Sequence, residues 1–231
     1  DPLDLINKYG ADAVRFTLSS MAAMGRDLKL SIDRVMGYRN FGTKIWNAAR
    51  FAKLNNCESS ANFFPSSVKH SINKWIIFET INLNKEVNNA LNSFRFNDAS
   101  YYLYSHIWSK FCDWYIEFSK PLFSGLDEEI KLETQQTYAW VFEQCLIMLH
   151  PFMPFITEEI WNQFKNHHQS SSKSLMLCDY PQEAENCIED DFKRIEWLKA
   201  IVSGIRNIRG ELSIKPSIKI AATFKGGDSG D

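Results

Sequence analysis

One segment near the N-terminus combines the side chains that bind single-stranded nucleic acid. Residues 34–57 hold five Lys or Arg side chains and no Asp or Glu. Aromatic rings and Arg planes stack on unpaired bases, amides and cations read base edges, and Lys and Arg bind phosphates. At about 100° per residue, an α-helix here places two sets of these side chains in rows. The Lys44 row is Asn40, Lys44, Asn47 and Phe51, and the Arg39 row is Arg39, Trp46, Arg50 and Lys53.

A third face of the same segment is apolar, which predicts that it is buried. This face comprises Tyr38, Phe41, Ile45, Ala48, Ala49 and Ala52. Phe51 lies roughly 110° from its centre, so the core does not require an aromatic ring there. The two rows therefore either bind bases or face a neighbouring helix, and the periodicity alone allows both interpretations.

The sequence contains no recognisable catalytic motif. A Gly-rich phosphate loop, G-x-S-x-G and H-E-x-x-H are all missing. Asp113 and Glu117 lie four residues apart among aromatic side chains, where ion pairs at a helix surface or between helices explain them better than acid–base catalysis. His167-His168 has no cysteine at zinc-ligand spacing. We therefore expect no catalytic, cofactor-binding or metal-binding residue in this chain.

Composition narrows the class of protein. The 231 residues are 45% apolar, 14% aromatic and 23% charged, which excludes a disordered chain. No apolar run approaches the roughly 18 residues that a membrane span needs. The formal charge is only −2, but residues 1–57 hold nine basic against five acidic side chains. This asymmetry indicates either a polyanionic partner at that end or an ordinary basic surface. The odd number of cysteines without C-x-x-C favours a reducing compartment.

Hydrophobic periodicity predicts helices along most of the chain. We expect helices over residues 3–24 with a break at Gly10, then over 32–55, 71–94, 98–121, 129–149, from 154 onward, and over 189–210. The helix at 98–121 should stop at Pro121 and point Leu103, Ile107, Phe111, Trp114 and Phe118 inward, with Phe111 and Trp114 largely buried. Alternating residues at 218–223 predict one strand. The fold class is therefore mainly α, an antiparallel helical bundle with a small α+β C-terminal piece.

Several segments resemble the valyl-tRNA synthetases, a family of class I aminoacyl-tRNA synthetases. The segment Gly10–Leu18 is similar to the Gly-Ala-Asp-Ala-Leu-Arg segment of that class, with Val14 in place of the usual Leu. Further similar stretches are GRDLKLS (25–31), YRNFGTKIWNAARF (38–51), FCDWYIEFSKP (111–121) and HPFMPFITEEIW (150–161), the last shared with the isoleucine and leucine enzymes. The resemblance covers residues 1–225 in order.

The resemblance implies an anticodon-binding region cut from a longer protein, an expectation that the first residue, Asp1, also favours over a complete chain. It implies a stem-contact segment at 1–31, an anticodon-binding helical bundle at 32–166, a loop at 167–187 and the start of a C-terminal region at 188–231. The family's His-x-Gly-His and Lys-Met-Ser-Lys-Ser motifs, which belong to its catalytic domain, are not in this sequence. The parent enzyme would use ATP with magnesium, whereas this part would hold no cofactor.

The family's anticodon-reading surface implies tRNA-binding roles for individual residues. Phe51 is similar to a phenylalanine that stacks on an anticodon base, and Lys44 matches a cation of the same surface. Arg34 is a further candidate, although the arginine that the family carries near this place aligns with Asp33, one residue earlier. The candidate tRNA-binding residues are Phe51, Lys44, Asn40, Asn47, Arg50, Arg39, Trp46 and Arg34.

The resemblance also implies a partner, valine tRNA, and a monomeric protein of the cytoplasm, together with the missing catalytic and C-terminal domains of its own chain. Two alternatives remain open. One is the anticodon-binding region of an isoleucine-type class I synthetase, and the other is a structural helical module that binds proteins and not RNA.

Overall fold

The computed structural model describes residues 1–22, 30–60, 62–163, 174–181, 190–215, 217–221 and 223. The chain divides into two compact units, Asp1–Phe192 and Lys193–Asp231. Most of the GRDLKLS segment, His167-His168 and most of the expected loop at 167–187 lie outside the described residues.

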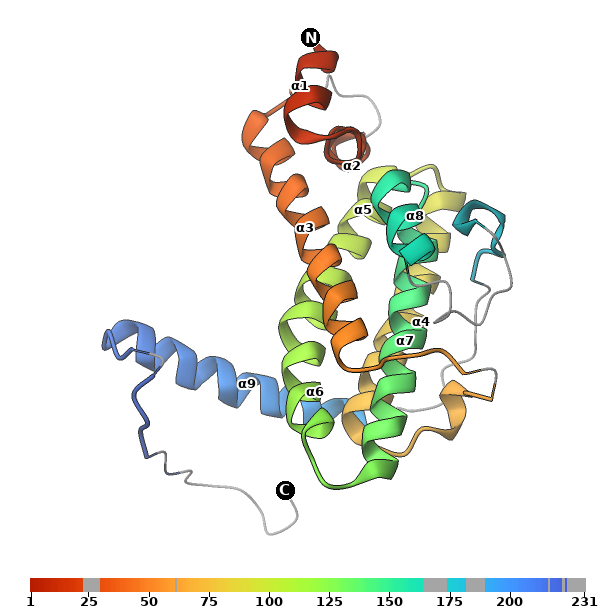
Figure 1. The fold of residues 1–231 in the computed structure, drawn as a ribbon. Helices are drawn as coiled ribbons and strands as arrows, with labels where there is room; N and C mark the ends of the chain where they lie inside the picture. The colour runs from red at the N-terminus through yellow and green to blue at the C-terminus, as the bar shows by residue number, and fades with distance from the viewer. Residues whose placement is uncertain are drawn as a thin grey trace. The chain divides into compact units, whose positions relative to one another are not determined.

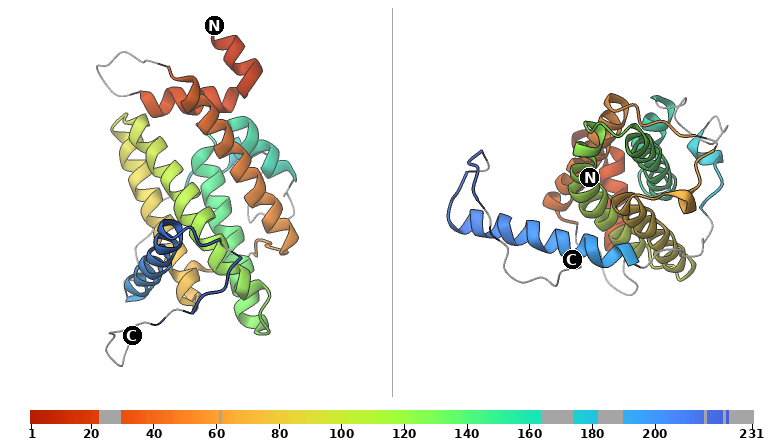
Figure 2. Two further views of the ribbon diagram at one scale, coloured as in Figure 1. Left: turned by 90° about the vertical axis from the view of Figure 1, so that its left-hand side faces the viewer. Right: turned by 90° about the horizontal axis from the view of Figure 1, so that it is seen from below.

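The first unit is an antiparallel helical bundle, as the sequence predicts. Its helices are α1 (Pro2–Tyr9), α2 (Ala11–Met21), α3 (Ile32–Leu54), α4 (Ser71–Asn92), α5 (Phe96–Ser105), the π-helical segment η2 (His106–Tyr115), α6 (Ile116–Phe123), α7 (Glu128–Leu149) and α8 (Pro154–Gln163), with 3₁₀ turns η1 (Pro65–Ser67) and η4 (Leu175–Leu177). Successive long helices α3, α4, α5–η2–α6 and α7 alternate in direction (Figures 1 and 2).

The core lies between these long helices, where large apolar side chains are almost fully buried. The predicted core face of α3 is confirmed: Phe41, Ile45, Ala48, Ala49 and Ala52 are at most 4% exposed, and Tyr38 is partly buried. Among the other side chains that lose essentially all contact with solvent are Phe16, Trp75, Ile76, Leu103, Phe111, Tyr115, Tyr138 and Trp161. Burial on this scale, at about 25 cal/mol per Å² of apolar surface, is the main stabilising term of the fold.

The first two helices meet at Gly10, where the sequence predicts a break. Gly10 has φ of 89°, a backbone conformation that side chains disfavour, and it lets α2 leave α1 at a sharp angle. The Asp12 carboxylate then accepts hydrogen bonds from the backbone N–H groups of Phe155 and Ile156 in the first turn of α8. Arg15 donates to the carbonyl oxygen of Pro151 at 2.9 Å. Two sequence segments far apart in the chain are therefore joined by one capping interaction.

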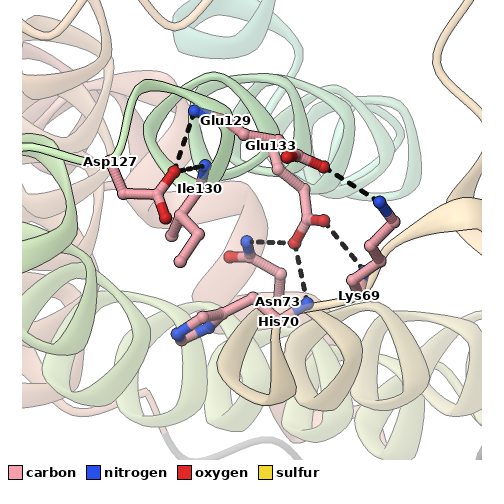
Figure 3. Close-up of polar contacts among 7 residues, drawn as sticks. All are labelled: Lys69, His70, Asn73, Asp127, Glu129, Ile130 and Glu133. Carbon is pink, nitrogen blue, oxygen red and sulfur yellow. Dashed lines mark hydrogen bonds and ion pairs between the residues drawn. The ribbon is translucent and has the colours of Figure 1, made fainter.

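A second carboxylate caps a helix from a distance (Figure 3). Glu133 of α7 accepts from the backbone N–H groups of Lys69 and His70 at the start of α4, at 2.9 and 3.0 Å, and from the Asn73 side chain at 2.9 Å. Asn73 is fully buried and also accepts from the Tyr115 hydroxyl at 2.9 Å. Because free N–H groups at a helix start need partners, this network fixes the start of α4 against α7.

The predicted inward face of the helix at 98–121 is partly wrong. Leu103, Ile107 and Phe111 are buried as predicted, but Trp114 is only partly buried and Tyr115 is fully buried instead. The cause is the π-helical segment η2, whose i→i+5 hydrogen bonds widen the turn, so that residues four apart keep facing the core. Sequence periodicity at 3.6 residues per turn cannot anticipate this change.

The predicted stop at Pro121 is also wrong, because α6 continues through Pro121 to Phe123. The helix ends two residues later, where the Ser124 hydroxyl lies 3.2 and 3.3 Å from the carbonyl oxygens of Lys120 and Pro121, close enough to bond both. Pro121 therefore lies within the last turn of the helix, where it disturbs few backbone hydrogen bonds.

The second unit consists mostly of α9 (Asp190–Glu211), a helix that begins at the end of the first unit. The strand predicted at 218–223 is wrong, since the described residues 217–221 and 223 form no strand. A single strand has no partner to satisfy its backbone. Instead, the Arg209 guanidinium donates to the carbonyls of Lys215 and Ile218, and Ile218 N donates back to Lys215 O at 3.0 Å, forming a turn.

Among the described residues, no helix has the length and apolar character required to cross a membrane.

Candidate nucleic-acid interface

The two rows predicted on α3 lie outside the core, as the periodicity requires. The exposed members are Arg39, Asn40, Asn47, Arg50 and Lys53, and the partly buried members are Lys44, Trp46 and Phe51. Arg34, in the first turn of α3, is also exposed. The helix is therefore buried along one face and presents cations, amides and aromatic rings on the others.

Lys44 is the most constrained cation of the candidate set. Its ammonium forms an ion pair with the Asp113 carboxylate of η2 and lies 3.8 Å from the centre of the Trp108 ring. The Lys44 side chain is 24% exposed and the Asp113 side chain 46% exposed. Among the described residues, by contrast, Arg39, Arg50 and Lys53 form no ion pair. These three can bind phosphates directly, whereas Lys44 already has a counter-ion.

The π-helical segment explains how Trp108 and Asp113 reach the same ammonium. The two residues are five apart, which in an α-helix places them about 140° apart around the axis. With i→i+5 hydrogen bonds, residues five apart lie about one turn from each other and share a face. The ion pair of Asp113 is predictable from the sequence, but the part of Trp108 is not, because α-helical spacing separates the two residues.

Neighbouring rings hold the Trp108 side chain in place. Tyr104 stacks on Trp108 with ring centres 5.5 Å apart and planes 19° apart. Tyr104 also contacts Tyr38 and Phe41 of α3, with ring centres 5.7 and 5.0 Å apart. Because this aromatic cluster joins α3 to η2, the position of the Lys44 ammonium is fixed from both helices.

Phe51 lies at the edge of a second aromatic cluster. Its ring centre is 5.8 Å from that of Phe123 and 5.9 Å from that of Tyr138. The Tyr138 hydroxyl donates to the carbonyl oxygen of Ala48 at 2.9 Å, which ties α7 to α3 beside Phe51. The Phe51 ring is therefore supported from the bundle side and still partly exposed, a suitable arrangement for a stacking surface.

The Arg39 row borders an open pocket of about 520 Å³. Arg39, Thr43 and Trp46 line it from α3, and the turn at residues 9–13 lines it from α1 and α2. Met153, Phe155 and Ile156 line it at the start of α8. The structure therefore places Lys44 beside η2, and Arg39 and Trp46 beside the start of α8. One helix offers two neighbouring polar surfaces.

This arrangement has the chemistry of a binding surface. Lys44 can donate to a base edge and Asp113 can accept from one. Phe51 offers a ring on which a base can stack, and the exposed arginines can bind phosphates. The sequence found Lys44 and Phe51 from their spacing on α3. It gave no signal for Phe123, whose part in supporting Phe51 depends on contacts between helices.

Comparison with known proteins matches this chain to one family. Residues 73–224 match the family "Anticodon-binding domain of tRNA ligase". Valine–tRNA ligase of Agrobacterium fabrum is 47% identical over 229 residues, which are 99% of this chain and 24% of that protein. Valine–tRNA ligase of Rhizobium meliloti is 45% identical over 94% of this chain and 23% of its own length. The chain thus spans about a quarter of the length of these relatives.

The fold has a solved counterpart in the ternary complex of Agrobacterium radiobacter K84 LeuRS with tRNA and LeuAMS. The TM-score is 0.60 over 79% of this chain and 21% of that one, at 16% sequence identity. This likeness supports the fold, and the sequence matches extend it to the family level. The chain belongs to the family of anticodon-binding domains of tRNA ligases.

Proposed function

We propose that this chain is the anticodon-recognition region of a valine–tRNA ligase, an enzyme that attaches valine to its tRNA during translation. The observation that carries the proposal is α3, which from residue 34 onward has no acidic side chain of its own and presents cations, amides and rings outside the core. The chain is 47% and 45% identical to two valine–tRNA ligases over 99% and 94% of its length, which supports valine as the amino acid of the parent enzyme. The reaction would use ATP and magnesium in a catalytic domain elsewhere in the protein.

In this proposal the Lys44 row contacts the anticodon. Phe51 stacks on one base, while Lys44, Asn40 and Asn47 contact base edges or phosphates. The Arg39 row and Arg34 bind the neighbouring backbone, because exposed guanidinium groups suit phosphate oxygens and stack on bases. The protein acts as a monomer in the cytoplasm, and the domain contributes binding and not chemistry.

The test of this proposal is tRNA binding by Phe51→Ala. Loss of a base stack costs about 1–3 kcal/mol, so valine-tRNA binding should weaken by roughly 5- to 150-fold. Binding is measured by titrating labelled tRNA with each protein, alongside thermal unfolding. Phe51→Leu, which keeps apolar packing against Phe123 and Tyr138 but removes the ring, should bind nearly as weakly as Phe51→Ala.

Phe118→Ala is the matched control, because Phe118 is also a partly buried ring but lies on α6 against Trp114 and not against Phe51. It should lower the melting temperature and leave most of the tRNA affinity intact. The proposal is wrong if Phe51→Ala binds valine tRNA like the parent, or if Phe51→Leu regains full affinity.

A further inference from the structure

We propose that Asp113 determines specificity at the RNA-binding surface, by accepting from a base amino group and by keeping phosphates away from Lys44. The inference rests on the proposed function, and it adds to that function a carboxylate on η2, a segment outside α3. It assigns a ligand class: a base edge that presents an amino group next to a ring nitrogen or carbonyl acceptor.

The Lys44–Asp113 pair has an electrostatic effect on phosphates. A lysine that faces solvent alone binds phosphates of any sequence, which gives affinity without discrimination. Asp113 contributes a negative charge in contact with the Lys44 ammonium, so the pair is neutral toward an approaching polyanion. Because 46% of the Asp113 side chain is exposed, a phosphate near Lys44 would also meet this carboxylate. The surface has other cations for phosphates, since Arg39, Arg50 and Lys53 are exposed.

The same pair also offers hydrogen bonds to a base edge. An ammonium only donates and a carboxylate only accepts, so the pair presents a donor beside an acceptor. Cytosine and adenine carry an amino group next to a ring nitrogen acceptor, and a carboxylate accepts from such amino groups. Uracil has no amino group for the carboxylate. The pair therefore favours amino-bearing bases over uracil and over phosphate.

The pair is also held rigidly, as a specific reader must be. Lys44 is confined by the carboxylate and by the Trp108 ring 3.8 Å away, and Trp108 is stacked on Tyr104. The π-helical turn brings Asp113 and Trp108 to one face of the segment. A base that forms hydrogen bonds with this pair meets groups that are already ordered, which reduces the entropic cost of binding.

The experiment compares Asp113→Asn with Glu117→Gln. Each removes one negative charge from the same helical stretch, but Glu117 is paired with Lys120 and not with Lys44. The ligands are the anticodon stem-loop of valine tRNA and the same stem-loop with its three anticodon bases replaced by uracil. Binding of both is measured at several salt concentrations, with a thermal melt for each protein.

Asp113→Asn should bind the uracil loop about fivefold more tightly than the parent does, the effect of removing one unit charge a few ångströms from a phosphate in water. Its salt slope should steepen by about 0.7, because a freed Lys44 meets one more phosphate. The affinity for the valine stem-loop divided by the affinity for the uracil stem-loop, the discrimination ratio, should therefore fall. Glu117→Gln should keep the parent's ratio, and Asp113→Glu, which retains the carboxylate, should keep most of it.

The inference would be overturned if the parent and Asp113→Asn had the same discrimination ratio between the valine and uracil loops. It would also be overturned if Asp113→Asn and Glu117→Gln changed this ratio equally. If Asp113→Asn melts early, Asp113→Ser replaces it in the same comparison: a lowered ratio supports the carboxylate's role, and a parent-like ratio contradicts it. A parent chain that binds neither loop would overturn the proposed function itself, which is a different result from loops bound with unchanged discrimination.

Discussion

His106 is a titratable ring held inside the bundle, at the first residue of η2. It is 2% exposed, and burial, together with the nearby Lys110 ammonium, lowers its pKa to about 3. The Thr80 hydroxyl donates to the carbonyl of Ile76 at 2.7 Å, so its oxygen is left to accept from His106 Nε2 at 3.3 Å. The ring is therefore neutral in the folded protein, with the proton on Nε2.

This burial predicts that acid destabilises the fold. The unfolded chain binds a proton at His106 near pH 6.5, whereas the folded chain resists protonation until about pH 3. Protons thus favour the unfolded state. The contribution of the neutral ring to the free energy of unfolding is fully present above pH 6.5 and is lost progressively as the pH falls from 6.5 toward 3. The slope from this residue is about 1.4 kcal/mol per pH unit well below pH 6.5.

Urea unfolding at pH 7, 6, 5 and 4 measures this slope in the parent and in His106→Gln. The variant should lose less stability per pH unit over this range, because its side chain does not titrate. Carboxylates contribute to both proteins alike and cancel in the comparison. Parallel pH profiles for the two proteins would show that His106 is not protected from protons by the fold.

At the scale of single elements, η2 sets which side chains are buried. Phe111 is 0% exposed and its ring contacts those of Tyr115, Tyr138 and Phe142, whereas Trp114 is partly buried near Phe118. Phe111→Ala should therefore cost about 3–5 kcal/mol of unfolding free energy, the range for a large buried ring. Trp114→Ala should cost less, because Trp114 is only partly buried whereas Phe111 is fully buried.

The two free energies come from denaturant unfolding of each variant under the same conditions. A larger loss for Trp114→Ala than for Phe111→Ala would mean that η2 is an ordinary α-helix in solution, with Trp114 turned inward as its 3.6-residue periodicity suggests.

The sequence predicts elements well where local signals decide them. The break at Gly10, the span of α3 and its buried face follow from a glycine and from apolar spacing, and the structure confirms them. The π-helical turn leaves no such signal, because it depends on how a whole segment packs. The same holds for the strand expected at 218–223, where alternation alone cannot supply a partner strand.

In the candidate site, too, the sequence predicts what local spacing decides and not what packing between helices decides. Spacing on one helix identifies Lys44 and Phe51 as members of a row outside the core. Their partners Trp108, Asp113 and Phe123 come from a different helix, so only the packing shows that Lys44 has a counter-ion. Asp12 is a further case, since its two hydrogen bonds to α8 bridge more than 140 residues of sequence.

At the scale of the first unit, the fold holds α3 as a rigid surface. Asp12 and Glu133 cap other helices from a distance, and aromatic clusters join α3 to α5, η2 and α7. The acid-free stretch 34–57 concentrates positive charge on one helix of a chain whose formal charge is −2. A surface of this kind binds a specific polyanion without attracting every nucleic acid to the whole protein.

The central claim is that this chain reads the anticodon of valine tRNA, and one titration tests it most directly. The parent chain is titrated with the anticodon stem-loops of valine tRNA and isoleucine tRNA at several salt concentrations. We expect the valine loop to bind at least about tenfold more tightly, with an affinity that falls linearly against the logarithm of salt concentration. Equal affinity for the two loops, or an affinity independent of salt, would contradict the account.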